Sequence, residues 1–463
     1  MVPGRTSAHA IDDSSAESNS PWYLSPDYTD GIDIIFDNAG NVLGGTVQAL
    51  VERLTTHQHM DTRFTTSFLL VFKRFTDIDT FIRLLIERFW IPPPKGLAGR
   101  DMDEWRRLKQ HVIRIRVLNT FKTMILDDDV VEEKDLHVLD QLMEFVQHDV
   151  VQSMAAGKHL LVQIRRIVCR IGDRARVKTM VSYDPQPTPI LPRSNRRPNL
   201  LEFDPLEVAR QVTMMECEIF MKIKANEFLS RSREKKGGSD AISAAIETSN
   251  KIACWVADAV LTKEDARKRA LIVKHFIQIA DRCRNMQNFS SMVAIISGLN
   301  SPSVRRLKRT WDQISQKFAG MLSACEMTID SGNNFNNYRQ LLQRIMPPCV
   351  PFIGELLSTL SVHLTTLTFI QDGAPNFISG DLVNFSKQAK AAEEIQKIQR
   401  WQSKPFNFVR VELIANYLHE QLNKLNDVPD VSDIFWNWSH EREPNETEDD
   451  KITRLMRETG FLP

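Results

Sequence analysis

Apolar residues recur at every third or fourth position along most of the chain, and this is the period of an α-helix. Runs such as VQALVERL, DIDTFIRLLIERF and DLHVLDQLMEFVQHDV follow it early, and RALIVKHFIQIADRC and LVNFSKQAKAAEEIQKIQRWQ follow it later. The alternating pattern typical of β-strands is nearly absent, apart from one short extended piece at IDIIF. We therefore predict an all-α protein.

Changes in composition divide the chain into helical domains and connecting segments. The start is rich in Ser, Asp and Pro, and YDPQPTPILPRSNRRPN reads as a linker between two long helical regions. The predicted parts are a disordered segment over 1–30, a first helical domain over 31–160, a basic helix and Pro-rich linker over 161–200, a larger helical domain over 201–440 and a polar tail over 441–463.

Helix starts can be read from capping residues. A helix is expected to begin near Thr46. Asp204 followed by Pro205, with Glu207 at the third helical position, is typical of a capping box. Thr262, with Asp265 three residues later, predicts a second start of the same kind.

The composition is that of an ordinary globular protein. Lys plus Arg and Asp plus Glu are 59 each in 463 residues, so no overall charge indicates nucleic acid as a partner. The first residues lack the apolar core of a signal peptide, and no run is long enough to cross a bilayer. Six cysteines are scattered without a CxxC pair, which predicts reduced, mostly buried thiols in a cytosolic chain.

The sequence carries no pattern of bond-making chemistry. It has no Ser/His/Asp set, no HExxH and no Cys/His ligand set, so we expect no metal and no cofactor. KKGGSD lacks the strand and helix that flank a phosphate-binding loop, so we interpret it as a flexible loop. Pattern alone therefore predicts a helical interaction protein.

The joint between the two domains is basic. Between Arg165 and Arg197 there are nine Lys or Arg against two Asp or Glu. One interpretation is a linker helix with solvated arginines. The other is a patch for an anionic membrane surface or an acidic partner, with Arg193, Arg196 and Arg197 in contact with lipid.

Several motifs of the second domain resemble the catalytic domain of Ras-type guanine-nucleotide exchange factors, the Son-of-sevenless-like class. They are FDPLEVARQVTMMECEIF, GLNSPSVRRLKRTW, PPCVPFIG, LTFIQDG, LVNFSK and IQRWQSKPFNF, and they occur in the family's order from about 202 to 440. The first domain is similar to the Ras exchanger motif through GGTVQALVERLT and FLLVFKRFTDIDTFIRLLIERF. Taken together, these motifs are most similar to those of fungal Ras activators.

The resemblance implies a function without bond chemistry. Such a protein binds a Ras-family GTPase and promotes GDP release through a helical hairpin, which the first domain supports. It implies a cytoplasmic protein with a peripheral position at the plasma membrane. The alternative is a scaffold that binds the GTPase without promoting exchange.

The resemblance also implies the site residues. The hairpin tip corresponds to Leu364–Gly373, with an acid before the glycine and a side chain one turn upstream that faces the Mg²⁺ site of the GTPase. The residues expected to act at the tip are Asp372, Thr368, Leu367, Phe369 and Gln371. Those expected to bind the GTPase are Arg269, Asn300, Ser301, Tyr338, Asn384 and Lys387.

One segment departs from the family. ELLSTLS, residues 355–361, is an apparent insert of about seven residues before the HLTTLTFI run. As a helix it would keep the apolar face in phase but lengthen the helix by about 10.5 Å. The alternatives are a loop that bulges out, a lengthened helix that weakens or abolishes exchange, or an error in the predicted coding sequence.

Overall fold

The structure is a computed structural model that describes residues 21–126, 130–131, 135–170, 185–192, 199–231, 240–330, 332–353, 355–356, 359–360, 362–426, 428–444 and 456. Helices dominate these residues, which confirms the all-α prediction. Packing divides the chain into two units. The first contains Met1–Val177 and Ile370–Glu393, and the second contains Lys178–Phe369 and Glu394–Pro463. Arg193, Arg196 and Arg197 lie outside the described residues.

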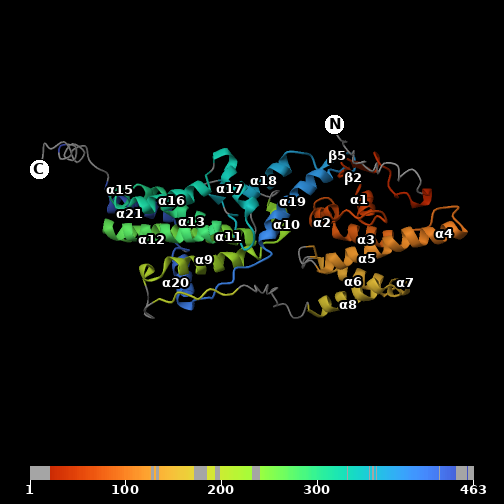
Figure 1. Ribbon diagram of the computed structural model, residues 1–463, viewed down its shortest axis with the longest axis horizontal. Coiled ribbons are helices and arrows are strands. Elements are labelled where there is room, and N and C mark those ends of the chain that lie inside the picture. The colour runs from red at the N-terminus through yellow and green to blue at the C-terminus, as the bar shows by residue number, and fades with distance from the viewer. Residues whose placement is uncertain are drawn as a thin grey trace, which may run out of the picture. The chain divides into compact units, whose positions relative to one another are not determined.

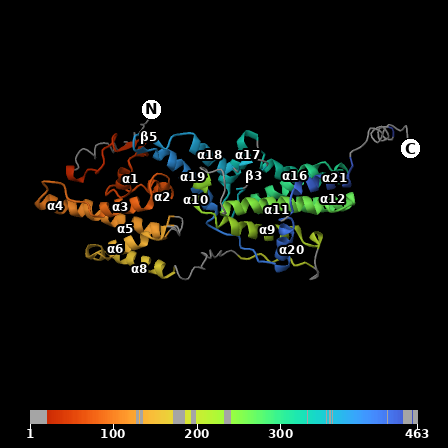
Figure 2. The same cartoon turned by 180° about the vertical axis from the view of Figure 1, so that it is seen from behind.

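The first unit is a set of packed helices around one hydrophobic core (Figure 1). Helix α5 packs against α3 and α8, and α6 packs against α3 and α8, so that these helices form successive layers in both Figure 1 and Figure 2. The helices are α1 (Val47–Leu54), α2 (Thr62–Val71), α3 (Ile78–Phe89), α4 (Gly99–Trp105), α5 (His111–Leu126), α6 (Val138–Gln147), α7 (Asp149–Gln152) and α8 (Ala155–Arg170), with 3-10 turns at Trp22–Leu24 and Phe72–Arg74 and a π-helical turn at Arg106–Gln110.

A small antiparallel sheet joins two distant parts of the chain within this unit. Its order is β1 (Ile34–Phe36), β2 (Val42–Gly45), β6 (Leu382–Val383) and β5 (Phe377–Ser379). A Cβ atom at Gly44 would lie 2.6 Å from the carbonyl oxygen of Val383, so only glycine permits β2 to approach β6 this closely. The sequence pattern did not predict β5 and β6.

Residues 21–30 correct the predicted extent of the disordered start. Tyr23 is buried, and its ring contacts that of Trp22. The carboxylate of Asp27 accepts hydrogen bonds from Arg88 at 2.6 Å and from Lys109 at 2.7 Å. These contacts hold the segment because Arg88 and Lys109 are themselves buried and need a charged partner.

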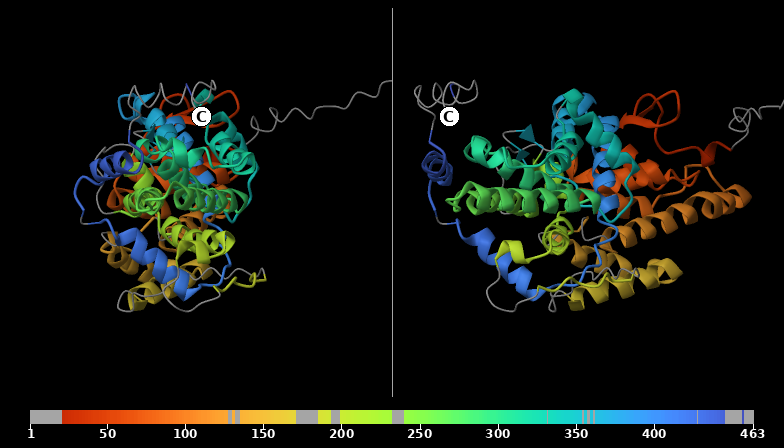
Figure 3. Two further views of the ribbon diagram at one scale, coloured as in Figure 1. Left: turned by 90° about the vertical axis from the view of Figure 1, so that its left-hand side faces the viewer. Right: turned by 60° about the vertical axis from the view of Figure 1, so that its left-hand side comes forward.

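The second unit is built around helices α11, α12 and α13, which pack against one another and against α9 (Figure 1; Figure 3 shows α11 and α12 in green). A Cβ atom at Gly298 of α13 would lie 2.6 Å from the carbonyl oxygen of Ala253, which explains the close approach of α11. Its elements are a 3-10 turn at Leu200–Glu202, α9 (Pro205–Phe220), α10 (Ala225–Arg231), α11 (Ala241–Leu261), α12 (Ala266–Asn285), α13 (Phe289–Leu299), α14 (Pro302–Arg305), α15 (Lys308–Trp311), α16 (Gln316–Thr328), α17 (Gly332–Arg344), β3 (Glu355–Leu356), β4 (Thr359–Leu360), α20 (Glu412–Asn423) and α21 (Val431–Arg442). Helices α18 (Val362–Asp372) and α19 (Phe385–Trp401) each contain residues of both units.

The caps of α1 and α9 were predicted correctly. Thr46 accepts a hydrogen bond from the backbone N–H of Ala49, and Asp204 accepts one from Leu206. Glu207 does not complete a capping box, because its carboxylate is buried and accepts from the backbone N–H of Ile190 at 3.0 Å.

The predicted cap of α12 was wrong. Asp265 is the residue that accepts from the backbone of Lys268 and starts this helix. Thr262 instead ends the preceding helix, α11. Thr262 and Asp265 both have a side-chain oxygen that can cap a helix, so the sequence alone allowed either residue to start α12.

The sequence also led to predictions about the cysteines and about membrane-spanning segments. All six cysteines are free thiols, and four of them are buried. Within the described residues, no helix combines the length and the apolar character needed to cross a bilayer.

Glu216 of α9 is a buried acid in the second unit. It is 3% exposed, and one of its carboxyl oxygens has no hydrogen-bond partner among the described residues. Burial raises the pKa of Glu216 to about 7, although a hydrogen bond with Ser290 lowers it. The folded protein therefore holds a proton that the unfolded chain has already released between pH 4.5 and about 7.

Glu216→Gln should remove a pH-dependent loss of stability. In the wild type, the free energy of unfolding should fall by about 3 kcal/mol as the pH rises through this window, because the ionised carboxylate is buried. Urea unfolding at about pH 5 and pH 8 should show the variant gaining stability over the wild type at the higher pH. Glu218→Gln, exposed on the same helix, is the control and should keep the wild-type slope. Equal slopes in Glu216→Gln and the wild type would contradict the expectation.

Candidate functional site

Helices α18 and α19 form a hairpin that carries most of the residues predicted to act. The chain leaves α18 at Asp372, runs through β5 and β6, and enters α19 at Phe385. Gly380 has a φ of 50°, in the left-handed region that favours glycine, and it lies in the turn between β5 and β6. The hairpin is thus a helix, a tight strand turn and a returning helix.

The exposed face of α18 combines one aromatic ring and one acid. Phe369 is 66% exposed, and Asp372, the last residue of the helix, is also exposed. These two residues are three positions apart and therefore lie on the same side of the helix. Leu367 is 1% exposed, so its side chain packs inside the protein and cannot contact a partner directly.

The other two predicted residues of α18 are half-buried. The hydroxyl of Thr368 donates a hydrogen bond to the carbonyl oxygen of Leu364, at 2.9 Å. The side-chain oxygen of Gln371 is buried and receives no hydrogen bond from the described residues. Neither side chain is as accessible as Phe369 or Asp372.

Lys387 holds the turn of the hairpin from inside. Its ammonium donates to the carbonyl oxygens of Gln371 and Ala374, at 2.7 and 2.6 Å, and to the side-chain oxygen of Asn376, at 2.8 Å. It is 5% exposed. The charge of Lys387 is thus used within the hairpin, and its direct contact with a partner stays a prediction.

Asn384 fixes the start of the returning helix. Its side-chain oxygen accepts from the backbone N–H of Lys387 at 3.1 Å, and its side-chain nitrogen donates to the carbonyl oxygen of Pro375 at the same distance. Its backbone N–H donates to Asn376. The geometry makes Asn384 a capping residue of the turn.

The outer part of the hairpin belongs to the hydrophobic core of the first unit. Phe385 is 2% exposed, and its ring centroid lies 4.7 Å from that of Phe64 and 6.3 Å from that of Phe68. Arg63 forms an ion pair with Glu393. Helix α2 of the first unit thus holds this segment by apolar burial.

Asn300 and Ser301 lie where α13 ends and α14 begins. Asn300 is exposed, and its amide donates to the carboxylate of Glu326 at 2.8 Å. The hydroxyl of Ser301 donates to the carbonyl oxygen of Gly298. Next to Glu326, Met327 is 64% exposed, an apolar surface residue that the sequence reasoning missed because it reads as part of a helical core pattern.

Arg269 and Tyr338 are two predicted binding residues whose side chains are buried. Arg269 is 1% exposed, and its guanidinium binds Glu443 at 2.8 Å and Thr310 at 2.9 Å. Tyr338 is also 1% exposed, and its hydroxyl accepts from the backbone N–H of Phe352. Both side chains are enclosed by the second unit, so they support the fold and do not offer a surface.

The apparent insert forms a short β-hairpin. Strand β3 pairs with β4 in antiparallel register, with Glu355 opposite Leu360 and Leu356 opposite Thr359, and α18 starts afterwards, at Val362. Of the alternatives left open by the sequence, the structure does not have the lengthened helix, because β3 and β4 pair before α18 starts.

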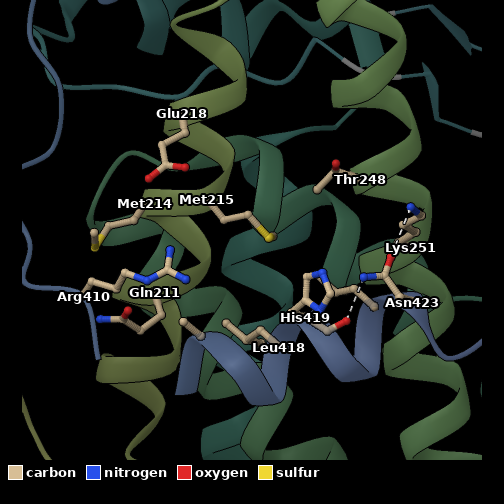
Figure 4. Close-up of a pocket in the computed structure, with 12 residues that line it drawn as sticks. Gln211, Met214, Met215, Glu218, Thr248, Lys251, Arg410, Leu418, His419 and Asn423 are labelled. Carbon is tan, nitrogen blue, oxygen red and sulfur yellow. Dashed lines mark hydrogen bonds between the residues drawn. The ribbon is translucent and has the colours of Figure 1, made fainter. Parts of the chain in front are cut away.

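The second unit has a cleft between α9, α11 and α20, lined by Met214, Met215 and Leu418 and by polar residues such as Lys251 and Arg410 (Figure 4). Among the described residues, no group of three or more His, Cys, Asp or Glu side chains is arranged to hold a metal ion.

The chain is similar to known proteins over both units. Residues 207–389 match the family model described as the RasGEF domain, and residues 41–145 match the RasGEF N-terminal motif. Cell division control protein 25 of Candida albicans is 34% identical over 428 residues, which cover 90% of this chain and 31% of that protein. The protein of the same name from Saccharomyces cerevisiae is 29% identical over 442 residues, 88% of this chain and 27% of that protein. Protein son of sevenless of Drosophila melanogaster is 27% identical over 438 residues, 87% of this chain and 27% of that protein. The chain thus spans less than a third of the length of these relatives.

Lys387→Met should loosen the hairpin turn without unfolding the protein. Three oxygens would lose a charged donor, at a cost of about 2 kcal/mol in the opening free energy of the turn. Hydrogen exchange of the amides between residues 374 and 384 should become at least about tenfold faster. Lys390→Met, exposed on the same helix, is the matched control and should leave these rates unchanged. Unchanged rates in Lys387→Met would show that the ammonium does not hold the turn.

Proposed function

Because the chain belongs to the family that joins a RasGEF N-terminal motif to a RasGEF domain, we propose that it is a guanine-nucleotide exchange factor that promotes GDP release from a Ras-family GTPase. The observation that carries the proposal is the exposed face of α18, where Phe369 and Asp372 project from a hairpin whose turn is fixed by buried contacts. The matched RasGEF region contains this hairpin up to residue 389.

The proposed activity makes and breaks no covalent bond. A small GTPase holds its nucleotide through phosphate contacts, Mg²⁺ and ordered switch loops. A protein that binds the nucleotide-free GTPase more tightly than the loaded form lowers nucleotide affinity by the same factor, because the two binding events are linked. The exchange factor therefore needs a rigid surface that fits the opened GTPase.

The hairpin residues suit these requirements in different ways. Phe369 offers apolar area that can displace a switch loop, and Asp372 offers a negative charge that competes with phosphate oxygens for their positive partners. Thr368, one turn before Asp372, is the residue we assign to the Mg²⁺ side of the contact. Asn300 and Ser301 offer polar groups from the second unit for a further contact.

The rival proposal is a GTPase-binding scaffold without exchange activity. The reason to consider it is the apparent insert directly before α18. Since β3 and β4 precede the helix and do not extend it, α18 keeps a length of 11 residues, and the physical reason for impaired exchange is weakened.

Release of fluorescent GDP from a purified Ras-type GTPase tests the proposal. The full chain should accelerate release, and Asp372→Ala combined with Thr368→Ala should slow the accelerated rate by about tenfold or more, or ~1.4 kcal/mol. Capture of the nucleotide-free GTPase should weaken by no more than about threefold, because both side chains act on the nucleotide site. Equal losses in the rate of GDP release and in GTPase capture would contradict the assigned roles. If the wild type captures the GTPase without accelerating GDP release, the scaffold is favoured.

Deletion of residues 355–361 tests the insert separately. Because β3 and β4 pair with each other and are not part of α18, the deletion should leave GDP release within about twofold of the wild-type rate. A large gain in rate would mean that the insert impairs exchange, and it would support the rival interpretation of the wild type.

A further inference from the structure

A cavity of about 230 Å³ lies in the second unit at the base of the hairpin. Arg339 of α17, the first turn of α18 and the later turns of α19 line it. The lining residues that matter here are Arg339, His363, Glu394, Lys397, Arg400 and Trp401. None of them belongs to the exposed face of α18 described above.

The charges around the cavity are unbalanced. Arg339, Lys397 and Arg400 bring three positive charges, and Glu394 brings one negative charge. Hydrogen bonds from His363 and Lys397 lower the pKa of Glu394 to about 2, although burial alone would raise it, so this carboxylate is ionised at neutral pH. Counted without His363, the lining carries an excess of two positive charges.

The cations are held in place by neighbours. Arg339 donates to the hydroxyl of Thr366 at 3.1 Å, and Arg400 donates to the carbonyl oxygen of Ile345 at 2.8 Å. Lys397 lies 2.9 Å from Glu394, while its side chain is 62% exposed. Side chains fixed in this way lose less entropy when an anion arrives.

Aromatic rings form another part of the wall. The ring of Trp401 lies edge-on to that of His363, with centroids 5.5 Å apart, and the guanidinium of Arg400 lies 5.7 Å from the centroid of Trp401. The Nδ1 atom of His363 is 2.7 Å from Glu394. The wall thus brings a flat aromatic ring beside the cations.

We propose that this cavity binds a small phosphate monoester, with its phosphate among Arg339, Lys397 and Arg400 and its organic part against Trp401. A phosphate monoester carries about −1.5 to −2 charges at neutral pH, which matches the excess charge of the lining. The planar forks of two arginines suit its oxygens. The volume is below that of pockets for drug-sized ligands, roughly 300 Å³ and above, so the ligand is small.

Occupancy would tie the start of α18 to α17 and to the base of α19. The ligand would add contacts to three elements at once and so stiffen the base of the hairpin. An effect on GDP release rests on the proposed exchange function, whereas binding itself does not.

Calorimetric titration of the full chain with phenyl phosphate tests the site. Lys397→Gln should weaken binding by about tenfold or more, because a charged donor is lost from an exposed position whose removal spares the fold. Arg339→Lys keeps the positive charge but lacks the planar guanidinium, so it should give an intermediate loss of affinity. Glu394→Gln should act in the opposite direction and tighten binding. Lys317→Gln, an exposed lysine of α16, is the control and should bind as the wild type does.

Three results would overturn the inference. They are no binding by the wild type, equal binding of phenol, which lacks the phosphate, and equal weakening in Lys317→Gln and Lys397→Gln. Parallel measurement of GDP release separates the two proposals. Binding without exchange would leave the site standing and remove the proposed function, whereas exchange without binding would do the reverse.

Discussion

The ammonium of Lys387, buried among oxygens of the hairpin turn, is the interaction on which the candidate site depends. A buried lysine is stable only when its charge is compensated, so the turn must close around it. Next to it, Phe385 enters an aromatic cluster with Phe64 and Phe68. The hydrogen bonds of Lys387 and the burial of Phe385 together fix the end of the hairpin. Without them, the hairpin would project as two unsupported helices.

Two buried glutamates show how the surroundings decide the state of one residue type. The pKa of Glu216 is raised to about 7 by burial that a single hydrogen bond does not offset. The pKa of Glu394 is lowered to about 2, because His363 and Lys397 donate to it. The first acid therefore makes the core sensitive to pH near neutrality, and the second remains a fixed negative charge.

The sequence predicted the fold class and several helix starts, because period and caps are local properties. It also predicted the position of the hairpin through the resemblance of LTFIQDG and LVNFSK. It did not show what depends on distant partners. Arg269 is enclosed by Glu443, which lies 174 residues away. Strand β6 pairs with both β5 and β2, and strands of two or three residues carry no strand period of their own. The roles of Asp372 and Thr368 stay predictions.

The β3–β4 hairpin also bears on how such a chain can change in length. It stands immediately before α18, which begins at Val362. Closing a slightly longer loop costs only a fraction of a kcal/mol, on the order of 0.6 for each doubling of loop length. If residues 355–361 are an addition to the family pattern, a self-paired hairpin at this point is a physically inexpensive way to accommodate them, because it does not alter the phase of the helix beside it.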